Sequence, residues 1–77
     1  MLIEDIPLTW QGPVTLARDE GWMCRAGQVL VDDQASGPEN RGVWLQAGGA
    51  WPFPEGTVLY YRSLIEPGAS IARGPIV

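Results

Sequence analysis

The chain has 77 residues and a net charge of −4, and it contains no histidine, no lysine and one cysteine. This length allows a single domain. The residue types that most acid–base, metal and nucleophilic catalysis requires are missing or nearly so, and we therefore predict no catalytic, metal or cofactor site. The negative charge opposes nucleic-acid binding, which needs a cationic stripe, and no apolar run approaches the roughly 20 residues of a membrane span.

Residues 1–12 are predicted to form an extended N-terminal arm, followed by a single β domain over residues 13–77. Pro7 and the Gly12–Pro13 pair oppose a helix in this arm. Its apolar residues suit packing on a sheet or on a neighbouring copy, and we expect them to make interface contacts. They are Leu2, Ile3, Ile6, Leu8 and Trp10. The acidic start of the chain does not resemble a secretion signal, which favours production in a cytoplasm.

Glycine and proline divide the rest of the chain into short segments of alternating apolar and polar residues, a pattern typical of strands. Turns are expected at 19–21, where Gly21 would supply a positive φ, at 26–27, and at 66–68, where Pro67 precedes Gly68. The predicted fold is all-β, a small antiparallel sandwich or a partly open barrel of about six short strands. The strands are expected at 14–18, 22–25, 28–32, 43–47, 57–63 and 69–73.

Two segments are predicted to be loops. Residues 33–42 are polar and rich in turn-forming residues, whereas Trp51–Pro52–Phe53–Pro54 is a stiff aromatic loop. Oxygen ligands for calcium are present near the first loop, but their spacing does not match a calcium-binding loop and Pro38 interrupts it, so we expect no metal there. These ligands would be Asp32, Asp33, Ser36, Glu39 and Asn40. Cys24 is interpreted as a small core residue.

Four tryptophans and two tyrosines are more aromatic surface than so small a core hides easily. We therefore expect part of it to contact another molecule or another copy of the chain. Rigid aromatic side chains are good interface anchors, which favours Trp51 and Phe53. Arginine pairs well at interfaces, and Arg41 and Arg62 are candidates for polar pairs at the rim. A homo-oligomer would also stabilise a small fold by mass action.

Residues 41–73 resemble small structural proteins of tailed bacteriophages, namely capsid decoration (cement) proteins, head fibres and related virion accessory proteins. The resemblance lies in the segment Gly42–Ala47, in the proline-rich aromatic segment continuing to Tyr61, and in the turn at 66–70. It implies a non-catalytic protein of the virion, a homotrimer that stabilises a particle. Its partners would be the major capsid protein or another virion protein.

Two other functions stay open. One is a small carbohydrate- or peptide-binding β module that uses the aromatic loop 51–54, because rigid aromatic rings can stack on sugars. The other is a small subunit or regulatory partner of a larger enzyme. A glycan array with a Trp51→Ala control separates the first of these from a particle-stabilising protein, since the latter is expected to give no sugar signal.

Overall fold

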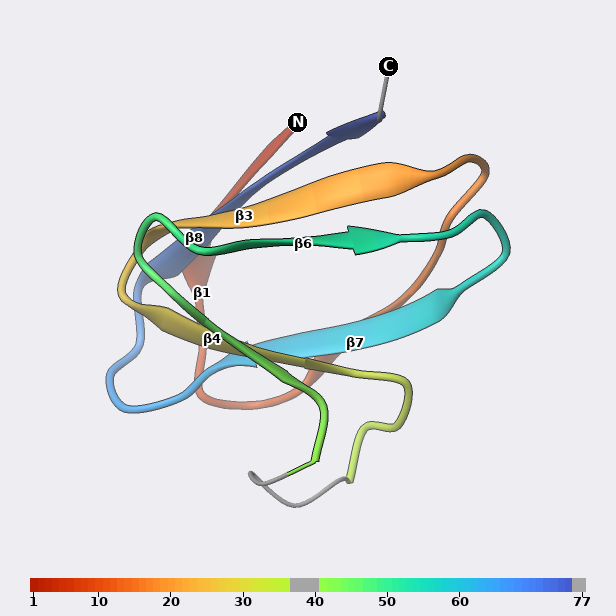
Figure 1. Cartoon of the computed structure of the whole chain (residues 1–77). Coiled ribbons are helices and arrows are strands. Elements are labelled where there is room, and N and C mark those ends of the chain that lie inside the picture. The colour runs from red at the N-terminus through yellow and green to blue at the C-terminus, as the bar shows by residue number, and fades with distance from the viewer. Residues whose placement is uncertain (37–40, 76–77) are drawn as a thin grey trace.

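Apolar residues on alternate positions place one side of each strand against the opposite sheet, and the result is an all-β sandwich (Figure 1). The computed structural model describes residues 1–36 and 41–75. Two antiparallel four-stranded sheets are present, with strand orders β1-β8-β3-β6 (sheet A) and β2-β7-β4-β5 (sheet B). The strands are β1 (Leu2–Ile6), β2 (Gln11–Thr15), β3 (Glu20–Ala26), β4 (Gln28–Asp32), β5 (Val43–Gln46), β6 (Ala50–Phe53), β7 (Val58–Ser63) and β8 (Ala69–Pro75).

The core lies between the two sheets and is centred on Trp22, which is fully buried. Phe53 and Tyr61 pack edge-on against this indole, with ring centroids 6.1 and 5.8 Å away. Both sheets contribute the other core side chains, which are Ile6, Leu16, Cys24, Val29, Val31, Leu45, Leu59, Ala69 and Ile71. The prediction of an all-β sandwich is confirmed.

Strand β4 has the predicted bounds, and β5, β7 and β8 lie within one or two residues of theirs. The segment predicted as an aromatic loop is instead β6, whose residues pair with β3. Gly21 does not form a turn, because it lies inside β3 and pairs with Gly74 of β8. The turn at Pro67–Gly68 is confirmed, and Gly68 has the positive φ of 100° that a type II turn requires at this position.

Residues 1–12 are part of the sandwich, so the predicted division at residue 12 does not hold. Strand β1 is an edge strand of sheet A, where Ile3 pairs with Ile71 of β8. Strand β2 begins at Gln11 and pairs with β7 in sheet B. The physical reason is that an extended backbone satisfies its hydrogen-bonding groups by joining a sheet, and Ile6 gains burial in the core.

A part-buried ion pair links strands β3 and β8 at one end of sheet A. Arg73 on β8 donates from Nε and a terminal nitrogen to the two carboxylate oxygens of Glu20 on β3, both at 2.8 Å. The Trp22 indole N–H donates to the same carboxylate at 3.2 Å, and the Arg73 guanidinium lies 5.1 Å from the Trp22 ring centroid. This Glu20–Arg73 clasp therefore holds two strands and the central core residue together.

In the described residues, no helix is long and apolar enough to cross a membrane.

Candidate functional site

Two of the predicted interface anchors belong to the core. Ile6 is 1 % exposed and Phe53 is 8 % exposed, because both side chains point between the sheets. Ile3 is half-buried and packs against the same core. The expectation that Ile6 and Phe53 contact a partner is thus corrected: in the folded chain these side chains stabilise the sandwich.

The remaining residues of the N-terminal segment lie apart from one another. Leu2 is exposed on β1 and Leu8 is exposed in the connection to β2. Trp10 is half-buried, and the guanidinium of Arg62 on β7 lies 5.3 Å from its ring centroid. Arg62 also donates to the carbonyl of Ser63 at 3.1 Å. The structure therefore brings together two predicted residues, Trp10 and Arg62, and places them on the outer side of sheet B.

Arg41 forms ion pairs within the chain at the base of the 33–42 segment. It donates to Gln34 at 2.7 Å and to the carboxylate of Asp33, and its Nε lies 3.6 Å from Asp32. The second carboxylate oxygen of Asp32 is buried without a hydrogen-bond partner among the described residues. Two of the residues considered as calcium ligands, Glu39 and Asn40, lie outside the described residues, as does Pro38.

The outer side of sheet B carries an aromatic surface built around Leu30. Leu30 is fully buried although it lies outside the core cluster, because its neighbours on the adjacent strands cover it. Trp44 on β5 and Arg62 on β7 are its direct cross-strand partners. We call this surface the aromatic face, and it comprises Trp10, Leu30, Trp44, Tyr60 and Arg62.

Trp44 is the most exposed tryptophan on the aromatic face, with 55 % of its surface accessible. Its indole N–H donates to the side-chain oxygen of Gln28 on β4 at 3.1 Å, which fixes the ring orientation. An indole that is held in place and exposed loses little conformational entropy on binding. Trp44 is not among the residues predicted from the sequence to make contacts. One signal in the sequence could have identified it. Trp44 is a large apolar residue between Val43 and Leu45, so it lies on the opposite face of the strand from these two.

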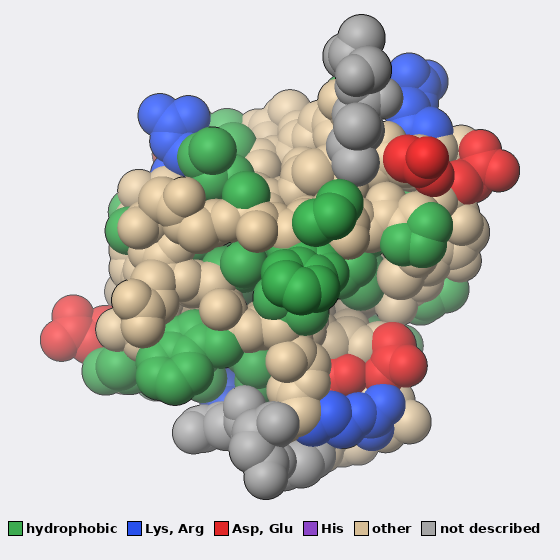
Figure 2. All heavy atoms as spheres, in the orientation of Figure 1, with side chains coloured by type: hydrophobic (Ala, Val, Ile, Leu, Met, Phe, Trp, Pro, Cys, Tyr) green, Lys and Arg blue, Asp and Glu red, His purple; other side chains and the backbone are tan. Residues whose placement is uncertain are grey.

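Trp51 lies on β6, the strand that follows β5, and is 52 % exposed. It pairs with Trp22 across the ladder, but β6 is the last strand of sheet A, so one side of its indole stays open to solvent. Figure 2 shows separate groups of hydrophobic side chains on the surface of the molecule that faces the viewer. Trp44 and Trp51 are thus half-exposed indoles on an edge strand of each sheet.

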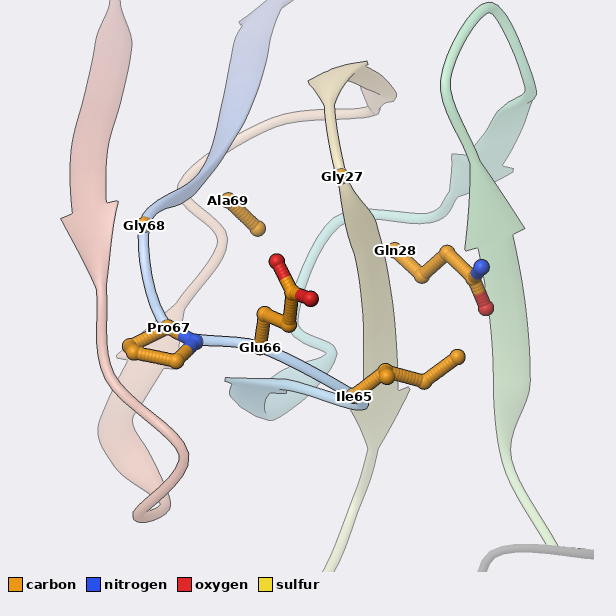
Figure 3. Close-up of a pocket in the computed structure, with 7 residues that line it drawn as sticks. All are labelled: Gly27, Gln28, Ile65, Glu66, Pro67, Gly68 and Ala69. Carbon is orange, nitrogen blue, oxygen red and sulfur yellow. The ribbon is translucent and has the colours of Figure 1, made fainter.

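A pocket of about 360 Å³ adjoins the aromatic face at the turn between β3 and β4 (Figure 3). Its residues come from Gly27–Gln28 and from 65–69, and the Glu66 carboxylate points into it. Gln28 lines this pocket and also holds the Trp44 indole. A partner docked on Trp44 would therefore have a neighbouring hollow, with a single carboxylate, for one of its own side chains.

Titratable groups in the described residues show no cluster suited to metal binding, since no three His, Cys, Asp or Glu side chains lie together there. The Cys24 thiol is buried and donates to the carbonyls of Ala26 and Gly27, each at 3.4 Å. Burial raises the pKa of this thiol above its ordinary value. The protonated thiol is thus favoured, which agrees with the interpretation of Cys24 as a core residue.

No family model, curated protein or solved structure matches this chain.

Proposed function

We propose that this protein is a non-catalytic structural module that stabilises a larger particle through contacts made by its exposed aromatic side chains. One observation carries the proposal: the core closes around Trp22, while Trp44 and Trp51 remain 55 % and 52 % exposed on neighbouring edge strands. About half of each of these indoles stays in water in the isolated fold. Tryptophan is enriched among the residues that dominate binding energy at protein interfaces.

The specific form of this function is a virion accessory protein, of the capsid decoration or a related type. It rests on the resemblance of residues 41–73 to such proteins. A small domain can stabilise a shell through modest contacts, because symmetry repeats each contact and multivalency then multiplies weak affinities. The proposed partners are further copies of the chain and a capsid or other virion protein.

A tryptophan double variant tests the proposal. Trp44→Ala combined with Trp51→Ala is expected to weaken binding to the particle at least tenfold, while the circular dichroism spectrum stays that of the folded parent chain and unfolding remains cooperative. Leu2→Ala is the matched control, because Leu2 is an exposed apolar residue of β1, which lies at the opposite edge of sheet A from β6.

The measurements are co-sedimentation with purified particles and electron microscopy of the loaded particles. Ordered density for the protein at symmetry-related positions is expected with the parent chain and with Leu2→Ala. Undiminished binding of the double variant contradicts the aromatic contact, and the absence of any particle association contradicts the virion role.

Carbohydrate binding is the second candidate, and one observation favours it: the aromatic face combines the Trp44 indole with the amide of Gln28 and with the Trp10–Arg62 pair. Aromatic rings beside hydrogen-bonding groups suit a ligand with apolar ring faces and polar edges. Residues 51–54, the segment predicted from the sequence as an aromatic loop, are less suited to bind a sugar, since Phe53 is a core residue. A glycan array with Trp44→Ala and Trp51→Ala, tested separately, distinguishes the two surfaces.

A further inference from the structure

The four edge strands of the sandwich differ in how they are protected against pairing with another chain. Strand β1 has two acidic residues, and its pairing with β8 shifts register around Asp5, which has a φ of 54°. Strand β2 contains Pro13 and β6 contains Pro52, and proline lacks the N–H that a new strand would need. Charges, irregular pairing and prolines are the usual means by which natural sheets block their edges.

Strand β5 has none of these protections. Its four residues, Val43–Gln46, include no charged residue and no proline, and β4 is its partner in sheet B. Backbone hydrogen bonds outside the ladders that join described residues do not involve Val43, Trp44 or Leu45. Among residues 1–36 and 41–75, no backbone group is bonded to the outer edge of β5 at Val43–Leu45.

The turn after β5 shows which backbone groups point to this open edge. Gly49 N–H donates to the Gln46 carbonyl at 2.7 Å as the chain turns toward β6, away from β4. Successive residues of a strand direct their N–H and C=O groups to opposite sides. The peptide groups of Trp44, two residues before Gln46, thus point to the open edge, whereas those of Val43 and Leu45 point toward β4.

We propose that β5 pairs antiparallel with β5 of a second copy of this chain. The inference rests on the proposed function, and it names the partner and the contact by which copies associate. A two-fold axis perpendicular to sheet B and passing beside Trp44 makes Trp44 a partner of itself. Its N–H then donates to the Trp44 carbonyl of the other copy, and the reverse bond forms by symmetry.

The side chains favour a second copy in this orientation. Directly opposed residues share one face of a sheet, so the two exposed Trp44 indoles become cross-strand neighbours, and aromatic cross-strand pairs are stabilising. Because the strands run in opposite directions, the two Arg41 guanidiniums stay at opposite ends of the pair. A parallel arrangement would place these like charges side by side. The uncharged strand introduces no repulsion of its own into the pairing.

This two-fold contact is complete in a dimer, because it leaves no free β5 edge for a third copy. It joins sheet B of one copy to sheet B of the other as one continuous eight-stranded sheet. It therefore predicts a dimer as the unit of association, whereas the resemblance to virion proteins implies a trimer. Solution mass by light scattering over a range of concentrations distinguishes these outcomes. A mass that rises from one copy to two supports the β5 contact, and a mass of three copies contradicts it.

Amide hydrogen exchange of the full chain, measured by NMR at low and at high concentration, tests the contact at the level of single backbone groups. Exchange of the Trp44 amide is expected to slow at least tenfold at high concentration. The Val43 and Leu45 amides, which point toward β4, are expected to exchange slowly and at the same rate under both conditions. A Trp44 amide that exchanges at one rate throughout overturns the proposal.

A substitution provides the second test. Trp44→Lys places a charge at the centre of the pair and is expected to weaken dimerisation at least tenfold, with a circular dichroism spectrum like that of the parent chain. Thr15→Lys is the matched control, since Thr15 is an exposed residue of β2, the other edge strand of sheet B. Equal dimerisation of Trp44→Lys and Thr15→Lys overturns the β5 contact.

The failure of this inference is distinguishable from the failure of the proposed function. A chain that stays monomeric at every concentration but binds particles through Trp44 and Trp51 overturns the β5 contact and supports the structural role. The reverse case is a chain that dimerises with protection of the Trp44 amide but binds particles equally well without the two indoles. That outcome supports the β5 contact and overturns the structural role proposed for the indoles.

Discussion

The two sheets use tryptophan in opposite ways, although both indoles have a side-chain hydrogen-bond partner. Trp22 in sheet A is fully buried and donates to Glu20, whereas Trp44 in sheet B is more than half exposed and donates to Gln28. Trp22 points into the sandwich, and Arg73 pairs with the carboxylate that holds it. Trp44 points outward from an edge strand. An indole hydrogen bond therefore does not show by itself whether a tryptophan serves the fold or a contact.

The largest expected effect separates these two roles. Trp22→Ala is expected to destabilise the fold by about 3–5 kcal/mol, because it leaves a large cavity at the centre of the core. Trp44→Ala is expected to cost about 1–2 kcal/mol, since about half of its side chain is already in water and the rest helps to cover Leu30. Urea denaturation of both variants measures the difference. Similar free energies of unfolding for the two variants would contradict the assignment of separate roles.

The clasp that holds Trp22 gives the next largest effect. Arg73→Leu leaves the Glu20 carboxylate part-buried with the Trp22 indole N–H as its remaining side-chain donor, and is expected to cost about 2–3 kcal/mol. Arg25→Leu is the matched control on the same sheet, because Arg25 is exposed on β3, and a change of less than about 0.5 kcal/mol is expected. Chemical denaturation checks both values. Equal stability of the two variants would mean that the ion pair does not support the core.

The same clasp predicts an acid-sensitive part of the stability. Hydrogen bonds from Arg73 lower the pKa of Glu20 below its ordinary value of 4.5, against the opposing effect of burial. A lowered pKa in the folded state stabilises the protein above the unfolded pKa, and this stabilisation is lost as pH falls through the folded value. The melting temperature is therefore expected to decrease as the pH is lowered from about 4.5. Glu20→Gln is expected to flatten this part of the curve, and an unchanged curve would contradict the assignment.

Most of the fold could be predicted from the sequence, because alternation and turn residues are local signals. The segment 28–32 shows this clearly, since Val29 and Val31 share one face of the strand and Gly27 has the positive φ of the preceding turn. The two missed strands have a physical explanation. Pro52 in β6 is tolerated because β6 is an edge strand, and the pairing of β1, the other edge strand, is irregular. A sequence does not show which segment lies at an edge.

The candidate site was less predictable. Trp10, Arg62 and Trp51 were selected for their residue types, and the structure places the first two in contact. Ile6 and Phe53 were selected by the same reasoning but lie in the core. Whether an apolar side chain of an extended segment points inward depends on the register between strands that are distant in the sequence. Leu30 shows the same limit, because its cover comes from β5 and β7.

The smallest expected effect concerns the bond that orients Trp44. Gln28→Ala removes the acceptor of the Trp44 indole N–H, and the cost to stability is expected to be about 0.5 kcal/mol because the exposed N–H can bond to water instead. The indole then gains rotational freedom, so association through the aromatic face is expected to weaken about threefold, as immobilising one more side chain opposes binding.

Gln46→Ala is the matched control for this last change, because Gln46 faces Gln28 across the β4–β5 ladder and is also exposed. The Trp44 indole N–H signal in an NMR spectrum is expected to shift and to exchange faster with water in Gln28→Ala, and to stay in place in Gln46→Ala. Weakened association without any change in that signal would assign a different role to Gln28, a direct contact through the pocket that its side chain also lines. Association as tight as that of the parent chain, despite a mobile indole, would show that a fixed Trp44 is unnecessary and that its exposed area alone makes the contact.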